Sequence, residues 1–404
     1  MTITDIGRVG GLLLLTVVCS APLAAQETRA EVIAAEQARK AKSSTPYEPT
    51  AAERFFERVE RGRWFTGGTP KGVYPVFGSI YPGGGFTLGA GYRKYTGYST
   101  FVDVHGMYSL EHYKLFEAGV GSTQHAGGRL DLAARIGWRD ATQIGFYGLG
   151  MSSSRSDRAN FRVNHTYAEG EIVVRPARWL ALTGLGGYDD YREPLPQGRH
   201  PSIHDAYTAV SAPLLGSEPA YVKAQGAASL LWGMASPGYS RTGGRYRLAY
   251  QAFSQARGGD GAFGLVRSEI VQHVPILRET WVLSLRARTD SVNSGNDDVP
   301  YFLLPSLGGG STLRGYSTGR FRDRHAMLLT AEWRWIPNRL GLDMALFADA
   351  GQVAPRFGDL DFDDLKMDYG IGARFHAPGV TILRLELARG DDGWRTVVAT
   401  SAPF

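Results

Sequence analysis

The sequence predicts an all-β protein, a 16-stranded antiparallel transmembrane β-barrel with a loop inserted into its lumen and a short helical segment before the barrel. Three observations carry this prediction. The chain begins with the pattern of a secretory signal, and its composition is rich in glycine and aromatic residues. Most of its length also alternates between apolar and polar residues with a period of two, which is typical of β-strands.

Residues 1–25 have the layout of a signal peptide. A basic residue precedes an apolar run over residues 9–18, and small residues lead to Ala24 and Ala25. The run is about ten residues long, too short for the roughly 20 that a membrane-spanning helix needs, so we expect removal after Ala25, with Ala24 as the alternative. Cys19 is the only cysteine, so the mature chain is expected to form no disulfide.

Composition favours a barrel over helical membrane proteins. The mean hydropathy is −0.20, and no apolar stretch after residue 25 approaches the length of a transmembrane helix. The 404 residues include 52 glycines, well above an average share of about 7%, together with 20 Tyr, 18 Phe and 8 Trp. The net charge of +5 comes from basic residues spread among acidic ones, so we expect no nucleic acid as a partner. The expected partners of a barrel are outer-membrane lipids.

Residues 26–71 are expected to form a helical and linker segment in the periplasm. Residues 26–65 are rich in Ala, Glu, Lys and Arg and nearly free of Gly, which predicts two short helices. The second is amphipathic, with Phe55, Phe56 and Val59 on one face. A plain periplasmic tail is the simpler interpretation, and a contact site for a separate periplasmic partner is the alternative.

The barrel is predicted to occupy residues 72–404, with regular alternation from Gly85 onward. In residues 328–335, for example, the odd-numbered side chains are apolar and would face lipid, whereas Thr330, Glu332 and Arg334 would face the lumen. The sixteen predicted strands are 85–95, 98–109, 111–121, 128–138, 141–150, 160–175, 178–191, 220–234, 243–256, 262–276, 279–292, 325–337, 340–353, 367–378, 380–390 and 393–404.

An even number of strands places both termini at the same end, and we expect that end to face the periplasm. Connections after odd-numbered strands should then be extracellular and longer than the others. The long connections 192–219, 293–324 and 354–366 fall in this class, and the short turns near residues 176, 337 and 378 fall in the other. Residues 234–243 are the exception, because they are longer than a periplasmic turn should be, and they leave the strand register open there.

The connection 293–324 holds the most informative motif. Long irregular loops are usually functional or disordered. Disorder is disfavoured here because the glycines at 308–310 allow a tight bend, while Leu313, Tyr316 and Phe321 favour burial. We therefore infer a loop folded back into the barrel.

Arg314 would lie at the tip of this loop. An arginine inside a barrel requires acidic partners. Glu332 and Asp349 are the lumen-facing acids on the next two predicted strands. Their role would be to hold the loop in place, either as a plug or as a part that moves during transport.

With these motifs the sequence resembles the BamA/TamA bacterial surface antigen superfamily of outer-membrane assembly and translocation barrels, which is related to the two-partner secretion transporters. The family's loop signature, glycines followed by [Val/Leu]-Arg-Gly-[Phe/Tyr], is matched by Gly308, Gly309, Gly310, Leu313, Arg314, Gly315 and Tyr316. Its strand signature, Phe-x-Asp-x-Gly, is matched by Phe347, Asp349 and Gly351. The resemblance implies that Arg314 pairs with Asp349 and Glu332 inside the barrel.

The resemblance also implies an outer-membrane location and a function in inserting or translocating a protein or lipid client. Family members usually carry several periplasmic client-binding domains, and we expect this chain to be a short member without them. The alternatives are a passive channel or structural barrel without translocation activity, and a surface antigen acting through the loop 192–219. We expect no enzyme activity, cofactor or metal.

The chain ends in Phe404, with Trp394 on the same closing strand. A terminal aromatic residue on the last strand resembles the signal that outer-membrane assembly machinery reads, so this machinery is an expected partner. Two weaker motifs are not taken as metal sites. His200 and His204 lack a third convergent ligand, and the acidic residues 358–364 lack the glycine and distal glutamate of the helix-loop-helix calcium site.

Overall fold

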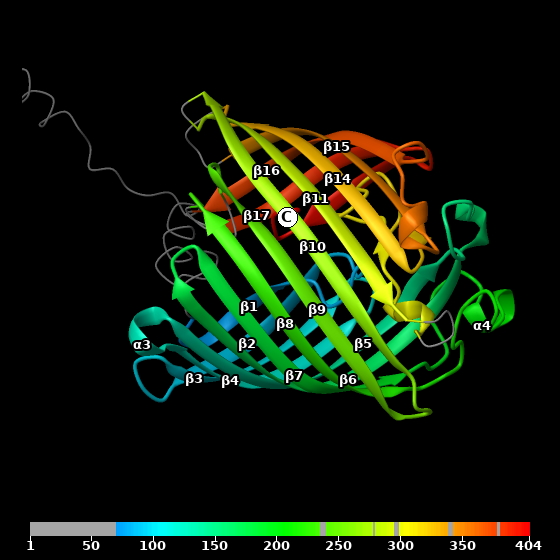
Figure 1. The fold of residues 1–404 in the computed structure, drawn as a ribbon, viewed down its shortest axis with the longest axis horizontal. Helices are drawn as coiled ribbons and strands as arrows, with labels where there is room; N and C mark the ends of the chain where they lie inside the picture. The colour runs from blue at the N-terminus through cyan, green and yellow to red at the C-terminus, as the bar shows by residue number, and fades with distance from the viewer. Residues whose placement is uncertain (1–69, 235–239, 278, 295–298, 338–341, 378–379) are drawn as a thin grey trace, which may run out of the picture. The chain divides into compact units, whose positions relative to one another are not determined.

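A computed structural model of the chain describes residues 70–234, 240–277, 279–294, 299–337, 342–377 and 380–404. The predicted signal peptide and the predicted helices of residues 26–65 lie outside these ranges. Sixteen strands form one antiparallel sheet in chain order. Figure 1 shows this sheet curled into a barrel whose strands run obliquely between an end with α3 (His125–Gly128) and an end with α4 (Ile203–Ala206).

Sixteen of the strands belong to the barrel, and two short ones lie inside a connection. The barrel strands are β1 (Gly72–Gly78), β2 (Thr87–Tyr95), β3 (Thr100–Ser109), β4 (Lys114–Gln124), β5 (Leu130–Phe146), β6 (Ala159–Ala177), β7 (Leu180–Arg192), β8 (Ala220–Trp232), β9 (Gly243–Arg257), β10 (Ala262–Leu277), β11 (Trp281–Asn293), β14 (His325–Trp335), β15 (Leu342–Ala354), β16 (Lys366–Ala377), β17 (Val380–Gly390) and β18 (Gly393–Ala399). The short strands β12 (Ser306–Leu307) and β13 (Phe321–Arg322) pair with each other between β11 and β14.

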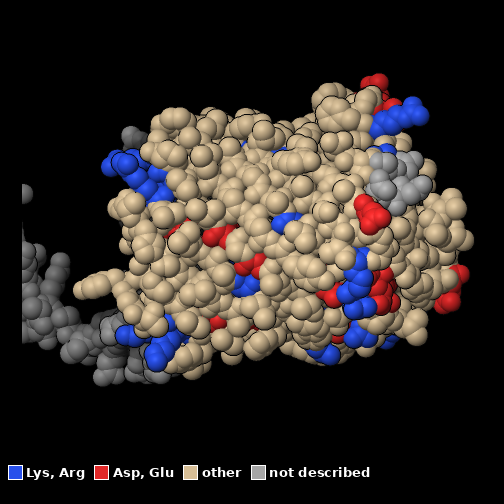
Figure 2. Space-filling view, turned by 60° about the horizontal axis from the view of Figure 1, so that its bottom comes forward, with Lys and Arg blue, Asp and Glu red and all other residues tan. Residues whose placement is uncertain are grey.

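The two faces of the sheet differ as expected for a membrane barrel. On β14, Thr330, Glu332 and Arg334 are buried, whereas Ala331 and Trp333 between them are exposed. Large apolar side chains are exposed around the outside, among them Phe116, Ile136, Ile172, Leu230, Leu248, Ile270, Leu285, Leu346, Ile371 and Leu387. Figure 2 shows charged residues gathered toward the two ends of one face, with only scattered charges between them. Such a surface suits contact with lipid.

No helix within the described ranges is long and apolar enough to cross a membrane.

Connections differ in length between the two ends of the barrel. Those after β7, β11 and β15 are long and lie at the end that carries α4, which we call the long-loop end. The connection between β8 and β9 belongs to the other end and is nevertheless ten residues long, residues 233–242. The sequence left the strand register open here. The β8–β9 ladder runs without a shift up to Trp232, and the β9–β10 ladder runs without a shift from Gly243, so the length is a real feature of the chain.

The predicted strand number is confirmed, but two of the early strands differ from the prediction. β1 was not predicted, and one strand, β5, replaces the two predicted at 128–138 and 141–150. Pro75 lies within β1, where an edge position tolerates a residue without a backbone N–H. On β5, the apparent turn at Asp140 is a strand residue whose carboxylate accepts two hydrogen bonds from Arg162 of β6, and a bulge follows it.

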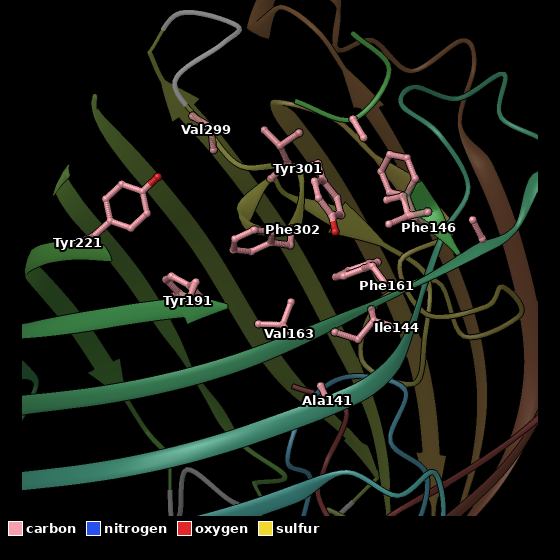
Figure 3. Close-up of a cluster of buried hydrophobic side chains, with 14 of the residues drawn as sticks. Ala141, Ile144, Phe146, Phe161, Val163, Tyr191, Tyr221, Val299, Tyr301 and Phe302 are labelled. Carbon is pink, nitrogen blue, oxygen red and sulfur yellow. The ribbon is translucent and has the colours of Figure 1, made fainter. Parts of the chain in front are cut away.

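A buried aromatic cluster lies at the long-loop end of the barrel. Tyr301 and Phe302, from the connection between β11 and β14, contact Phe146, Phe161 and Tyr191 at the ends of β5, β6 and β7. Figure 3 shows these rings converging over the strand ends. Aromatic pairs in edge-to-face arrangements stabilise such contacts beyond simple burial. We call these five residues the loop cap.

Candidate functional site

The connection between β11 and β14, residues 294–324, is called the plug loop here, and its described residues 299–324 are folded back into the barrel. Its first turn, Tyr301–Leu303, contributes to the loop cap, and β12 and β13 then form a small ladder. Gly308 and Gly309 both have φ of +106°, which L-residues rarely adopt. The sharp bend at these glycines directs the chain toward the wall formed by β14–β17.

Arg314 lies at the tip of the plug loop, with 1% of its side chain exposed. Its Nε donates to Asp349 Oδ2 at 2.7 Å and its Nη2 donates to Asp349 Oδ1 at 3.0 Å. Its Nη1 donates to Glu332 Oε2 at 3.0 Å and to Glu386 Oε1 at 3.1 Å. Burial opposes the charge, but Asp349 and Glu386 outweigh it, so the pKa of Arg314 lies above its ordinary value.

Two further arginines donate hydrogen bonds to these acids. Arg374 of β16 pairs with Glu332 and donates to Glu386 at 3.0 Å, and Arg384 of β17 donates to Glu386 at 3.0 Å. The resulting cluster has three guanidinium groups and three carboxylates, all nearly fully buried. We call Arg314, Arg374, Arg384, Glu332, Asp349 and Glu386 the lock cluster. Such a network stabilises only while every member keeps its partners.

The strand motif Phe-x-Asp-x-Gly of β15 supports Arg314 physically. The guanidinium carbon of Arg314 lies 3.4 Å from the centroid of the Phe347 ring, a close cation–π contact. Asp349 supplies the bidentate carboxylate two residues later on the same lumen face. At Gly351, a Cβ atom would lie 2.9 Å from the backbone oxygen of Met327 and 2.8 Å from the Leu307 side chain of the plug loop, so glycine avoids a clash with β14 and leaves room for the loop.

The plug loop is also tied to β16, to β18 and to the turn between β17 and β18. Tyr316 donates its hydroxyl proton to Met367 O and accepts from the backbone N–H of Asp391, both at 3.2 Å. Arg395 of β18 donates to Tyr316 O, and Arg320 forms an ion pair with Asp392 at 2.9 Å. Displacement of the plug loop would therefore remove contacts from β18 as well as from the lock cluster.

The plug loop and its strand partners match a known family. Residues 236–393, which contain both motifs, match the Omp85 superfamily domain. Residues 236–393 of this barrel are an Omp85 superfamily domain. The Omp85 barrel resides in the outer membrane, and its plug loop, β14 and β15 all lie within the matched region.

Solved structures share the fold of this barrel. BamA from Haemophilus ducreyi lacking POTRA domains 1–3 aligns with a TM-score of 0.59 and 15% identity over 81% of this chain and 70% of that one. CdiB from Acinetobacter baumannii aligns with a TM-score of 0.52 and 12% identity over 82% and 59%. CdiB from Escherichia coli aligns with 0.55 and 14% over 83% and 64%. The chain thus spans less than two thirds of either CdiB chain, and no curated protein matches its sequence.

The loop residues predicted from the sequence lie close together in the plug loop of the Omp85 barrel. Gly308–Gly310, Leu313 and Tyr316 all belong to the buried part of the plug loop, and Gly315 lies so close to Gly390 and Asp368 that a Cβ atom would overlap both. Sequence reasoning missed Glu386, Arg374 and Arg384. The alternation in residues 383–387, Leu-Arg-Leu-Glu-Leu, could have indicated that the charged residues of β17 face the lumen.

The C-terminal residues behave differently from the expectation. Trp394 is exposed on the outer face of β18, but the strand ends at Ala399, whereas the sequence predicted pairing to Phe404. Phe404 stacks on His273 of β10, with centroids 6.3 Å apart, and lies 5.7 Å from the guanidinium carbon of Arg286 of β11. The physical reason is that β18 is an edge strand, so its end has no second partner strand to hold it in the sheet.

Proposed function

We propose that this Omp85 barrel inserts or translocates a protein or lipid client at the outer membrane, using the seam between β1 and β18. The observation that carries the proposal is the sheet order. The ladder runs from β1 to β18, and no described residue of β1 pairs with β18. These two strands are also the shortest of the barrel, at seven residues each. Unpaired edges of this kind are templates for pairing with a strand of another chain.

The plug loop supports the same proposal, because it contacts one side of the seam. Arg395 of β18 donates to Tyr316 O, and a Cβ atom at Gly310 would lie 2.8 Å from Val397 of β18. A shift of the plug loop would release β18 from the inside of the barrel. The lock cluster would then set the energy that a client, or a partner, has to supply.

A separate periplasmic partner at residues 26–65 is part of the proposal. This segment precedes the barrel and lies outside the described residues. Barrels of the Omp85 family are generally non-enzymatic, and we propose a mechanical role for the lock cluster and no catalytic one. A passive or structural barrel is the second candidate, favoured by the charge balance of the lock cluster and by the loop cap over the lumen.

Disulfide locking tests the proposal. Cysteine pairs, one on β1 and one on β18, would be scanned for oxidative cross-linking across the seam. The control is a cysteine pair at Ala227 and Ala249, which are already partners in the β8–β9 ladder. We expect seam cross-links to abolish complementation of a deletion strain, measured as the outer-membrane protein and lipid profile, and a reductant to restore it.

The same experiment can contradict the proposal. Full complementation by a seam-locked barrel would favour the passive barrel. Loss of complementation by the ladder control as well would show that cross-linking harms the barrel in general.

A further inference from the structure

The lumen wall formed by β8–β11 carries a surplus of positive charge. Its cationic side chains are Lys223, Arg245, Arg247, Arg267, Arg286 and Arg288. Five of them lie within ion-pair distance of a carboxylate, from Asp189, Glu169, Glu269 or Asp290. Arg247 has no carboxylate within 4 Å among the described residues, and its side chain makes one long hydrogen bond, 3.4 Å to Ser229 Oγ.

A cavity of about 270 Å³ lies beside Arg247. Its polar wall consists of Lys223, Gln225, Arg247, Gln251 and Arg267, together with Asp189. The remaining wall is largely apolar and lies under the loop cap, with Tyr191, Phe253, Leu265 and Leu303. Ligand sites commonly combine an apolar wall with a few converging polar groups in this way.

The charges of the cavity favour an anion. Asp189 accepts from Lys223 and contacts the His165 ring nitrogen, both at 2.9 Å, so its carboxylate is already neutralised. Arg267 is paired with Asp290, yet 46% of its side chain remains accessible. The guanidinium of Arg247 has N–H donors that are not bound to any carboxylate of the described residues. A planar guanidinium binds phosphate oxygens in a bidentate manner, and lumen arginines and lysines are used by anion and phosphate pores.

We propose that this cavity binds a small phosphate monoester that carries an apolar group. The phosphate would lie on Arg247, with Lys223 and Arg267 beside it. The apolar group would contact Phe253, Leu265 and Leu303. Because Leu303 belongs to the plug loop, the ligand would touch both the barrel wall and the plug.

Calorimetric titration of the folded barrel tests the proposal. The protein would be held in a maltoside detergent and a phosphate-free buffer, and titrated with phenyl phosphate and with lysophosphatidic acid. Both probes are phosphate monoesters. Tighter binding of phenyl phosphate would indicate a free ester as the ligand, and tighter binding of lysophosphatidic acid would indicate a lipid headgroup. We expect one site per barrel, and at least a tenfold weaker affinity in Arg247→Gln.

Arg139→Gln is the matched control. Arg139 is also without an ion pair among the described residues, but its guanidinium lies over the ring of Tyr167 at 4.8 Å and does not line the cavity. We expect this variant to keep the affinity of the parent. Heat-modifiable gel mobility would verify that both variants are folded.

Three outcomes would overturn the proposal. The first is that neither probe binds the parent barrel. The second is an equal loss of affinity in Arg139→Gln and Arg247→Gln, which would indicate general lumen electrostatics. The third is that benzoate binds as tightly as phenyl phosphate, which would remove the assignment to phosphate.

Discussion

Arg314 organises the lock cluster because it is the only member contributed by the plug loop. Its three acidic partners come from β14, β15 and β17, so one side chain joins the loop to three strands. Removing one member of a buried ion pair typically costs about 3–5 kcal/mol, since the remaining charge is left without a partner. The contribution of each buried acid to stability therefore depends on whether it has a cationic partner.

Asp368 and Asp349 provide a direct comparison. They are cross-strand partners on β16 and β15, and both are buried. Asp349 is paired with Arg314, whereas Asp368 forms no ion pair with any described residue. We expect Asp349→Asn to lower the free energy of unfolding by about 3–5 kcal/mol. The temperature of the heat-modifiable gel transition should fall accordingly. Asp368→Asn should raise that temperature, because it removes a buried carboxyl group that lacks a cation.

Equal destabilisation by the two variants would contradict this assignment of roles.

Arg314→Lys tests whether the geometry of the arginine matters in addition to its charge. Lysine keeps the charge but cannot bind Asp349 in a bidentate manner or stack flat on Phe347. We expect its transition temperature to lie between those of the parent and Arg314→Ala.

β18 is held in the sheet from one side only, and a short tail follows it. β18 has one partner strand, and the chain leaves it at Ala399. Its inner face contacts the plug loop, and Phe404 contacts β10 and β11. The element thus combines a terminal aromatic residue, which the sequence relates to assembly, with a contact inside the lumen.

Two substitutions separate these roles. If Phe404 is read during assembly, Phe404→Ala should reduce the amount of barrel in the outer membrane several-fold. His273→Ala removes the ring on which Phe404 stacks, together with the hydrogen bonds of His273 to Ser284 and Arg334, but it keeps Phe404 itself, so it should leave that amount unchanged. Quantification of the heat-modifiable band in isolated outer membranes checks both. An equal reduction by His273→Ala would show that the lumen contact itself is required for assembly.

For the whole molecule, the plug loop is held at two levels of the lumen. Tyr301 and Phe302 anchor its first part in the loop cap, and Arg314 anchors its tip in the lock cluster. The two anchors belong to one loop, so loss of either leaves the loop attached at the other. We therefore expect the lumen to open fully only when both anchors are removed.

Single-channel recording checks this arrangement. We expect Tyr301→Ala and Arg314→Ala to give brief openings as single variants and sustained conductance when combined. The effect of the double variant should exceed the sum of the single effects, since the two residues hold the same loop. Sustained conductance in Arg314→Ala alone would show that the loop cap contributes nothing to closure.

Much of this architecture is determined by local sequence pattern. Period-two alternation placed β6–β11 and β14–β17 correctly within a few residues, because lipid on one side and the lumen on the other select different side chains at each step. The motifs around Arg314 and Asp349 also located the plug loop. Local pattern failed where a polar residue such as Asp140 is satisfied by a distant strand and not by a turn.

The remaining features depend on tertiary structure. The convergence of Arg374, Arg384 and Glu386 on Arg314 depends on the register and tilt of strands, which bring residues far apart in the chain to one level of the lumen. The unpaired seam, the position of Phe404 and the uncompensated charge of Arg247 have the same origin. Each of these features depends on which groups find a partner after the sheet has curled. The period of the hydrophobic residues sets which face a side chain occupies, but it does not specify pairing across the lumen.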